Sequence, residues 1–531
     1  MGLDSDNGDK SGGFRSFIYR VTQRPCGKGR ASFRSFLLYR VAGDWELRCN
    51  FWIRFFLSSI FLALLYQLDP FGLSSLSQHH SQTLFQRWTA DLYPDREVAR
   101  KISVVLFSDA ELEKMHLSWP PPYSVHAEVL ERILEFSPKA VFVDIAFVDQ
   151  HRNDPTFIEL GETIRSYREK KIPLFFAAGR TDGNLPDGVI PDLAAAGALL
   201  VGVPGTGDDR QSFSYPLEVE INAGTQKHRE CSTRLSAATA MYASSSLNDS
   251  AASNSQMQRS FLTSKGYLDD QRSSDMQLVW RFFDKEGNNG PFRCKPISRS
   301  PLLNFWQGLN LDLTFSDDVP PKNRSVEVPG TIQVCPPQDT ISVEQLLFNL
   351  TQEFVRELKC SLQQSFVIYG AYIAFNEDLV DPPTHTPIPG AFYHAMALDN
   401  LLTFGSEYRR TAEPVFDCIG LTKPMAIELV SLLLLVLLVQ YGEFIWRGLG
   451  PSDPTAEHGN SRLLNVSYLL ALTLRNLFLI LLLLVGGAVF STYLLLQPST
   501  DFLGLLGLLS IKSLPFFGRM LVRIQHYFHL N

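Results

Sequence analysis

Residues 102–145 read ISVVLFSDAELEKMHLSWPPPYSVHAEVLERILEFSPKAVFVDI and contain two apolar, β-branched runs separated by an amphipathic stretch. The runs are Ile102–Phe107 and Ala140–Ile145, and each has the length of a buried strand. Between them, Ser124–Phe136 places apolar residues at every third or fourth position, which is helical spacing. Strands separated by helices of this length indicate βαβ units. The segment therefore predicts an α/β fold with a mostly parallel sheet flanked by helices.

The alternation of strands and helices continues along the chain. Up to residue 204 we predict a helix at Phe157–Lys170 and strands at Ile172–Ala177 and Ala198–Val203. Beyond it we predict strands at Ser214–Ile221, Met276–Phe282 and Ser365–Tyr369, and helices at Ser232–Ser246, Ser342–Leu358 and Gly390–Phe404. These elements give the domain a core at 99–407.

Two stretches of this domain have the composition of irregular structure. Residues 244–274 are rich in Ser, Asn and Gln, and we expect a mobile surface insertion there. Residues 284–340 carry many Pro and polar residues and form a second irregular stretch.

Three stretches are long and apolar enough to span a membrane, at 51–68, 424–446 and 476–497. The first ends at Asp69-Pro70, and a cleaved signal peptide is the competing interpretation. We favour an uncleaved anchor, because 50 residues precede it and no clear small-x-small site follows. The second contains Leu429–Val439, in which ten of eleven residues are Leu or Val. That run alone contributes about −3 to −6 kcal/mol to insertion.

A fourth span at 502–521 is weaker, because Lys512 falls in its middle and costs about 2.5–3.5 kcal/mol there. Pro515 would kink the helix without preventing it from spanning. We expect an α-helical membrane region of three to four spans.

The distribution of Lys and Arg predicts the orientation. A basic arm at 1–50, a loop at 447–475 and a tail at 522–531 are expected in the cytoplasm. Residues 69–423 then lie outside the cytoplasm, and they carry a net charge of −13 within a total of −7. An acidic body with basic ends is not typical of nucleic-acid binding. The sequence thus predicts a multi-pass protein of the cell membrane.

Two carboxylates stand where the first two predicted strands end: Asp109 follows the first strand and Asp144 ends the second. Ligands of open parallel sheets bind beyond the carboxyl ends of the strands, so both are candidate ligand-binding residues. A structural role is the alternative for Asp109. Ser108 and Glu111 fit a helix capping box, which would put Asp109 in the first helical turn.

Trp119 begins the rigid turn Trp-Pro-Pro-Pro-Tyr, which leads into the helix that carries His126. Either Trp119 covers a ligand pocket or it fills the core. Likewise, His126 either faces a cleft or is a packing or surface residue of its helix.

A third polar cluster is predicted late in the chain, where a strand ending in glycine leads into an acidic loop and then into a helix. The loop supplies Asp381 as a candidate ligand-binding residue, and the helix, which opens with Pro389-Gly390, supplies His394. The acidic residues of the loop are Glu377, Asp378 and Asp381. The sequence has no metal-ligand spacing, phosphate-binding loop, nucleophile elbow or kinase signature, so neither a metal nor a cofactor is predicted.

Five cysteines fall in the predicted outer region, and an odd number leaves at least one thiol free. Cys294 and Cys335 bracket the second irregular stretch, and we expect a disulfide between them.

The order of these motifs resembles the second type of the CHASE family, the extracellular sensory domains associated with cyclases and histidine kinases. The opening part of the family pattern is an acidic residue, Trp-Pro, a helix with His/Tyr-Ala and a strand ending Asp-Ile-x-Phe. Here it corresponds to Asp109, Trp119-Pro120, His126-Ala127 and Asp144-Ile145-x-Phe147. The closing part corresponds to Gly370, Asp381, Thr386-Pro387, Pro389-Gly390 and His394-Ala395, and a middle turn to 203–205 and Tyr215-Pro216. The basic residue that follows Trp-Pro in the family is replaced here by Pro122-Tyr123-Ser124.

The resemblance implies that the outer domain receives a signal, from a ligand that the sequence does not identify, and that the membrane helices transmit it. The expected cytoplasmic segments are each too short to bury a catalytic core. We therefore expect output through a separately encoded cytoplasmic partner that contacts 14–48, where aromatic and Leu residues lie among Arg. A helix on the lipid surface is the alternative for this arm.

Two rival functions remain open. The chain is a scaffold or effector subunit if its membrane helices assemble into a homo-oligomer. It is an extracytoplasmic hydrolase if Asp109, Asp144 and His394 form a catalytic site. The sequence shows no nucleophile–base–orienter set, so no enzyme activity is predicted.

Overall fold

The computed structural model describes residues 45–505 of the 531-residue chain, with gaps. The residues left undescribed are 1–44, 69–72, 91–92, 94–97, 149–153, 179–188, 205–212, 224–229, 248–254, 266, 269–274, 282, 285–294, 299–330, 336–337, 349–350, 374–377, 384–387, 412–413, 417–420, 450–473, 475–477, 495–500, 502–504 and 506–531.

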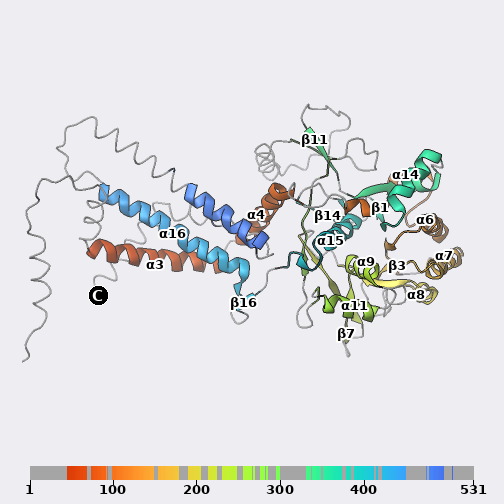
Figure 1. Ribbon diagram of the computed structural model, residues 1–531, viewed down its shortest axis with the longest axis horizontal. Coiled ribbons are helices and arrows are strands. Elements are labelled where there is room, and N and C mark those ends of the chain that lie inside the picture. The colour runs from red at the N-terminus through yellow and green to blue at the C-terminus, as the bar shows by residue number, and fades with distance from the viewer. Residues whose placement is uncertain are drawn as a thin grey trace, which may run out of the picture. The chain divides into compact units, whose positions relative to one another are not determined.

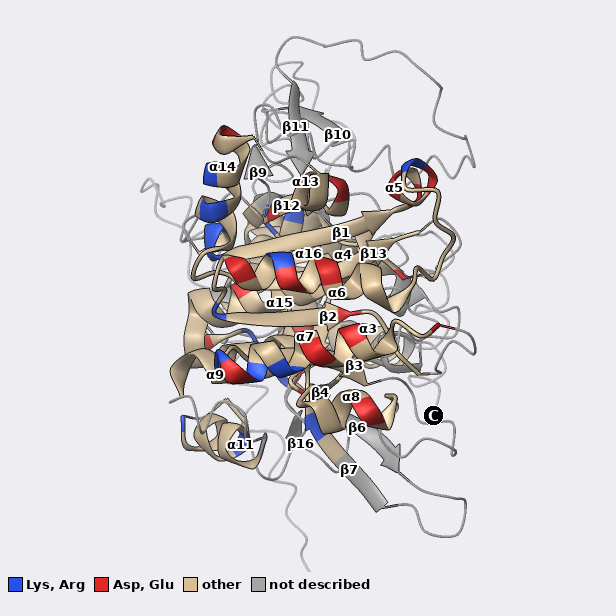
Figure 2. Cartoon of the chain, turned by 90° about the vertical axis from the view of Figure 1, so that its right-hand side faces the viewer, with Lys and Arg blue, Asp and Glu red and all other residues tan. Residues whose placement is uncertain are grey.

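A six-stranded sheet organises the domain, and every neighbouring pair of its strands is parallel. Figure 1 shows the ribbon of the chain, and Figure 2 labels the six strands in their order, β12-β1-β13-β2-β3-β4. The strands are β1 (Ile102–Ser108), β2 (Ala140–Asp144), β3 (Leu174–Ala178), β4 (Leu199–Gly202), β12 (Asp339–Ser342) and β13 (Phe366–Tyr372). The predicted α/β fold with a mostly parallel sheet is confirmed. The late strand β13 enters between β1 and β2, which strand lengths alone could not reveal.

Successive residues of a strand face opposite sides of the sheet, and this alternation divides the interior into two cores. In β1, Val104 and Leu106 belong to one core, whereas Val105 and Phe107 belong to the other. Both faces are apolar because helices cover both, as is usual for parallel sheets. Figure 2 shows the consequence: charged residues lie mainly on the helices, and the strands are almost free of them.

Five of the described helices cover one face of the sheet, and one of them, α6 (Tyr123–Glu135), corresponds to the helix predicted at Ser124–Phe136. The others are α7 (Phe157–Glu169), α8 (Pro191–Ala196), α13 (Val343–Phe348) and α14 (Gln352–Leu362). The other face is covered by α9 (Ala237–Ser246), α11 (Ser255–Ser264) and α15 (Gly390–Phe404). α15 has the bounds predicted from the sequence, and eleven of its fifteen residues are buried.

Two predicted helices differ from the structure at their boundaries. The helix predicted at Ser232–Ser246 begins as strand β7 (Glu230–Leu235), which pairs with β6 (Glu218–Ala223), and only Ala237 onward is helical. The single helix predicted at Ser342–Leu358 is two helices, α13 and α14. The second one starts anew because the Thr351 side chain accepts a hydrogen bond from the backbone N–H of Phe354 and caps it.

In the stretch 244–274, where we predict a mobile insertion, the described middle part contains the helix α11. Leu262, Tyr267 and Leu268 of this stretch are buried in the core shared with α9 and α15. The Tyr267 carbonyl also accepts a hydrogen bond from the Tyr408 hydroxyl at 2.8 Å. The polar composition of the stretch gave no sign of these few buried apolar residues, and its mobility stays a prediction.

The irregular stretch at 284–340 contains short strands among its described residues. β10 (Lys295–Ser298) and β9 (Phe283–Asp284) both pair antiparallel with β11 (Thr331–Cys335). Cys294 lies outside the described residues. The register places Lys295, the residue after Cys294, opposite Val334, the residue before Cys335. The disulfide stays a prediction.

Among the described residues, one helix is long and apolar enough to cross a membrane, at Lys423–Tyr441 with a mean hydropathy of 2.0. It belongs to α16 (Lys423–Leu449). The helix α3 (Trp45–Leu68) contains a shorter apolar part at Phe55–Leu64, and another short apolar helix lies at Phe478–Thr492. Of the expected fourth span, only Leu505 is described. Three to four spans therefore stay a prediction.

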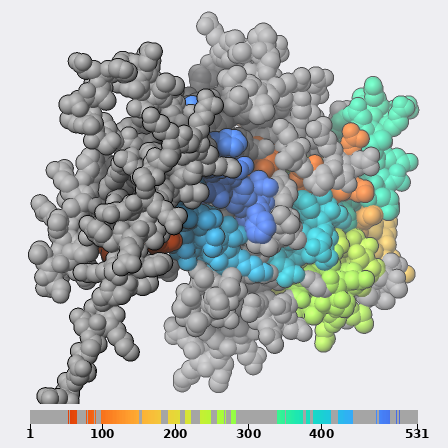
Figure 3. All heavy atoms as spheres, turned by 60° about the vertical axis from the view of Figure 1, so that its left-hand side comes forward, coloured from red at the N-terminus to blue at the C-terminus, as the bar shows by residue number. Residues whose placement is uncertain are grey.

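The chain forms two compact units, and each is described by itself. One consists of residues 1–61, 436–476 and 512–531, and the other of 62–435 and 477–511. The second unit contains the whole sheet, the start of α16 and the short helix at 478–492. In Figure 3, α16 in light blue and that helix in darker blue are neighbours.

Candidate functional site

At the carboxyl ends of the sheet strands, the carboxylate of Asp144 lies near the start of α15. Asp144 ends β2 and lies opposite Gly370 of β13. A Cβ atom at position 370 would lie 2.9 Å from the Cβ of Ala391, so glycine is required for the start of α15 to approach the sheet. Asp144 shares its face of the strand with Ala140 and Phe142, and this is the face that α15 covers.

His394 of α15 lies between Asp144 and a tyrosine. Its Nδ1 is 2.8 Å from the Tyr215 hydroxyl, and its Nε2 is 3.6 Å from Asp144 Oδ1. The Tyr215 oxygen already accepts a hydrogen bond from the backbone N–H of Ala238 at 3.1 Å. Its hydroxyl proton is therefore free to be donated to Nδ1, which directs the Nε2–H of a neutral imidazole towards Asp144.

Asp378 is the third titratable member of the cluster. It precedes the two-residue strand β14 (Leu379–Val380), which pairs with β15 (Ile388–Pro389). This pairing brings Asp378 to the start of α15, where its carbonyl accepts a hydrogen bond from the backbone N–H of Gly390 at 3.0 Å. A Cβ atom at position 390 would clash with the Asp378 carboxylate. The carboxylate thus lies at the positive end of the α15 dipole.

Burial dominates the electrostatics of the three groups. Burial raises the pKa of Asp144 to about 7. Burial, and then the negative charge of Asp144, raise the pKa of Asp378 to about 7, although His394 opposes the shift. Burial lowers the pKa of His394 to about 4, and Asp378 only partly offsets that effect. At neutral pH the imidazole is therefore uncharged and its contact with Asp144 is not an ion pair.

The cluster of Asp144, Asp378 and His394, called the acidic cluster below, can change its charge near neutral pH. As the pH rises through the range around 7, the two carboxyls lose their protons and the cluster becomes negatively charged. Two nearby carboxylates and a neutral imidazole suit a proton or a hydrogen-bonding ligand. Within the described part of the chain, no group of three His, Cys, Asp or Glu side chains has the arrangement of a metal site.

The remaining predicted site residues lie elsewhere. Asp109 is exposed in the first turn of the short helix α5 (Asp109–Lys114). The Glu111 carboxylate accepts hydrogen bonds from the backbone N–H groups of Ser108, at 2.6 Å, and of Glu344, at 3.0 Å. The structural alternative for this segment is therefore present, and Glu111 caps the starts of two helices, α5 and α13.

Trp119 and His126 lie with the core on the opposite face of the sheet from His394. Trp119 is half-buried and its ring lies 6.5 Å from that of Phe107. His126 is buried, with its Nδ1 2.9 Å from the Tyr369 hydroxyl. Asp381 is exposed, three residues beyond Asp378. Of the six residues predicted to bind a ligand, the structure brings Asp144 and His394 together.

Two members of the site were not singled out from the sequence. Asp378 is one of three acidic residues in the loop that the sequence marks as polar, but the residue predicted to bind a ligand there is Asp381. Tyr215 had a signal only in the Tyr-Pro of the middle turn. Neither residue can be identified from its local sequence. The pairing of β14 with β15 and the packing of β5 (Ser214–Pro216) against α15 decide which side chains reach His394.

A second buried polar group lies further along α15. Asp399 forms an ion pair with Arg281 at 2.6 Å, and both side chains are at most 2% exposed. Burial raises the pKa of Asp399 to about 6, and Arg281 opposes this shift most strongly. The next residue, Asn400, bonds both backbone groups of Val279 at 2.9 and 3.1 Å. α15 is thereby fixed to the segment 278–281.

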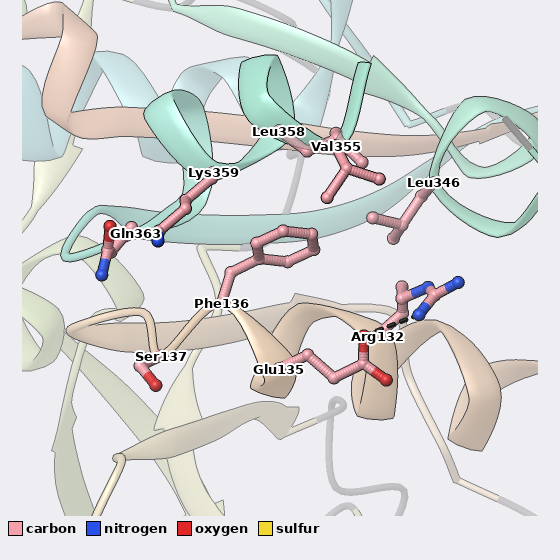
Figure 4. Close-up of a pocket in the computed structure, with 9 residues that line it drawn as sticks. All are labelled: Arg132, Glu135, Phe136, Ser137, Leu346, Val355, Leu358, Lys359 and Gln363. Atoms are coloured by element: carbon pink, nitrogen blue, oxygen red, sulfur yellow. Dashed lines mark hydrogen bonds and ion pairs between the residues drawn. The ribbon is translucent and has the colours of Figure 1, made fainter. Parts of the chain in front are cut away.

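A pocket of about 360 Å³ opens near the amino ends of the strands, between α6 and α14 (Figure 4). Phe136, Leu346 and Leu358 form its apolar wall, and the Arg132–Glu135 ion pair, 2.6 Å long, lies on its rim. Ser137 and Gln363 precede β2 and β13, so the pocket lies at the amino ends of the strands. Ligands of such sheets bind at the carboxyl ends, which favours the acidic cluster as the functional site.

The comparisons with known proteins give one match. A family model described as the CHASE2 domain matches residues 57–439, which is most of the chain. No curated protein and no solved structure matches the chain.

Proposed function

The chain belongs to the CHASE2 family of extracellular sensory domains, and from this premise we propose that it is a membrane-anchored sensor subunit whose outer domain responds at the acidic cluster. The observation that carries this proposal is the position of the cluster. Asp144, Asp378 and His394 are held between the sheet edge and the start of α15, where a change of charge alters the contact between the two.

The proposed response is a change in the packing of α15. With both carboxyls ionised, two negative charges lie close together in a poorly solvated site, which disfavours that arrangement. A proton or a ligand that donates hydrogen bonds relieves this repulsion and stabilises the arrangement described here. A sensor needs such a pair of states with different affinities for its signal.

The proposed output is through a separately encoded cytoplasmic protein that contacts residues 14–48, which lie outside the described residues. The rival scaffold function predicts ion flux or assembly without a response of the outer domain. The rival hydrolase gains little from the geometry. Tyr215 is the hydroxyl next to His394, and its burial raises its pKa far above the range of a nucleophile.

Thiol labelling in intact cells tests the sidedness on which the proposal depends. Cys360 is a free, exposed thiol of the outer domain. We expect a membrane-impermeant maleimide to label Cys360 in intact cells and to reach a thiol introduced by Arg30→Cys only after permeabilisation. Cys360→Ser is the control that identifies the native signal. The opposite labelling pattern would refute the proposed orientation.

A second experiment tests the response itself, with external acidification as the probe. The full chain is reconstituted in vesicles with a dye at position 30 on the inner side, and the outer pH is stepped from 8 to 6. We expect a change of dye fluorescence that is lost when both Asp144→Asn and Asp378→Asn are present. An unchanged response in this double variant contradicts the role of the cluster.

Co-purification from membranes tests the partner. Deleting residues 1–50 should lose a protein that the full chain retains. If the deletion loses none, the role proposed for the arm is wrong.

A further inference from the structure

The helix α4 (Leu73–Thr89) precedes the sheet in the chain and binds different parts of its unit at its two ends. It contains many Ser, Thr, Gln and His residues and has little apolar surface of its own. Such a helix is held in place by tertiary contacts rather than by propensity. The position of α4 therefore depends on the side chains that make those contacts.

At its beginning, α4 binds one buried carboxylate. Asp501 Oδ2 accepts a hydrogen bond from the Ser77 hydroxyl at 2.5 Å, and Oδ1 accepts one from Ser81 at 2.8 Å. Ser77 and Ser81 are four residues apart and so lie on one face of the helix. The backbone N–H of Asp501 donates to Glu428 Oε1 of α16 at 2.6 Å. Asp501 is 1% exposed and Glu428 2% exposed.

This group, called the Asp501 clamp below, joins three chain segments. Asp501 follows the predicted third span, Glu428 lies near the start of the second, and α4 follows the first. Glu428 accepts the Asp501 N–H in a buried site, although it lies near the end of an apolar helix.

At its other end, α4 binds the segment 278–281, which contacts α15, and the stretch that begins with Asp378. Gln86 donates to the Leu278 carbonyl at 2.9 Å and accepts from the backbone N–H of Trp280 at 3.3 Å. The segment 278–281 is in turn fixed to α15 through Asn400 and Asp399. Arg87 donates to the Pro383 carbonyl at 2.5 Å, on the same described stretch as Asp378.

We propose that α4 couples the acidic cluster to the membrane helices, with the Asp501 clamp holding α4 in one of two arrangements. This inference rests on the proposed function. Hydrogen bonds connect every step from His394 on α15, through 278–281 and α4, to α16. A change in the packing of α15 is transmitted along the rigid helix α4 and opens or closes the clamp.

The titratable groups around His394 are Asp144 from β2, Asp378 from the segment before β14, Tyr215 from β5 and Tyr393 on α15 itself. Coupling between two sites is reciprocal. If protonation of this cluster shifts the clamp, then weakening the clamp must shift the protonation midpoint of the cluster. A purely structural anchor lowers stability but leaves that midpoint unchanged.

The test uses the full chain in lipid nanodiscs, with 3-fluorotyrosine at position 215 as a ¹⁹F probe next to His394. The ¹⁹F shift is followed from pH 5 to 8 for the wild type, Asp501→Asn and the milder Ser81→Ala. We expect each variant to move the midpoint by about half a pH unit, a roughly threefold change in proton affinity. Thr89→Val is the matched control, because it removes only a bond from Thr89 to Phe85 within α4.

Unchanged midpoints in both clamp variants overturn the proposal, whatever happens to their melting temperatures. A wild type that shows no titration in this range also overturns it, because the clamp would then have no equilibrium to bias. If Asp501→Asn does not fold, Ser81→Ala decides alone. The labelling of Cys360 is independent, so an inward-facing domain would refute the sensor function without affecting the nanodisc result.

Discussion

Replacing Asp144 by Asn should make the stability of the domain built on the six-stranded sheet less dependent on pH. Burial raises the pKa of Asp144 from 3.8 to about 7. A carboxyl whose pKa is higher in the folded state than in the unfolded state stabilises the fold below its unfolded pKa. That stabilisation is lost as the pH rises through the folded pKa. Asn keeps the shape of the side chain and has no charge to bury.

The magnitude follows from these two pKa values. One unit of pKa difference corresponds to about 1.4 kcal/mol. At pH 5 the folded carboxyl is protonated while the unfolded one is mostly ionised, and by pH 8 both are ionised. Between these limits, Asp144 alone should lower the free energy of unfolding of the wild type by roughly 2–3 kcal/mol. The stability of Asp144→Asn relative to the wild type should rise by the same amount.

Guanidinium unfolding of the full chain in nanodiscs, followed by tryptophan fluorescence to which the buried Trp280 contributes, measures this difference at several pH values. Asp109→Asn is the matched control, because Asp109 is exposed and directly follows β1, another strand of the same sheet. It makes the same change of a carboxyl to an amide at a side chain outside the acidic cluster. A difference between Asp144→Asn and the wild type that stays constant from pH 5 to 8 would refute the reasoning, since Asp144 would then not be buried as a charge.

Two further predictions concern the packing of α15. Arg281→Met should lower the free energy of unfolding by about 3–5 kcal/mol, because it leaves the buried Asp399 without its cation. The additional change Asp399→Leu should restore much of that loss in urea unfolding. A double variant that is no more stable than Arg281→Met would argue against a role of the pair in stability. Gly370→Ala should cost about 1–3 kcal/mol through the contact with α15. Gly161→Ala is the control in the same thermal melts: a new Cβ there would lie 3.7 Å from the Arg165 guanidinium, so the change should not destabilise the helix α7.

The prediction that α16 spans a membrane depends on local sequence more than on the fold. The apolar stretch that begins α16 is evident from Leu429–Val439 alone, since insertion depends on a sum over consecutive side chains. The hydrogen bond that Glu428 accepts from Asp501 cannot be predicted from this stretch, because it depends on a residue that is distant in the sequence.

The sequence by itself determined the strands β1, β2 and β3, the helix α15 and the face to which Asp144 points. Apolar runs of strand length and helical spacing are local properties, and the side-chain alternation of a strand follows from its backbone. The capping box at Ser108 was also predictable, since its two partners are three residues apart.

Only the tertiary structure decided which residues form the site. β13 enters the sheet between β1 and β2, and the β14–β15 pairing selects Asp378 rather than Asp381. Tyr215 meets His394 across 179 residues of chain, and Ser81 meets Asp501 across 420. Contacts over such separations depend on how the elements pack, because no local preference of the backbone or of a side chain encodes them.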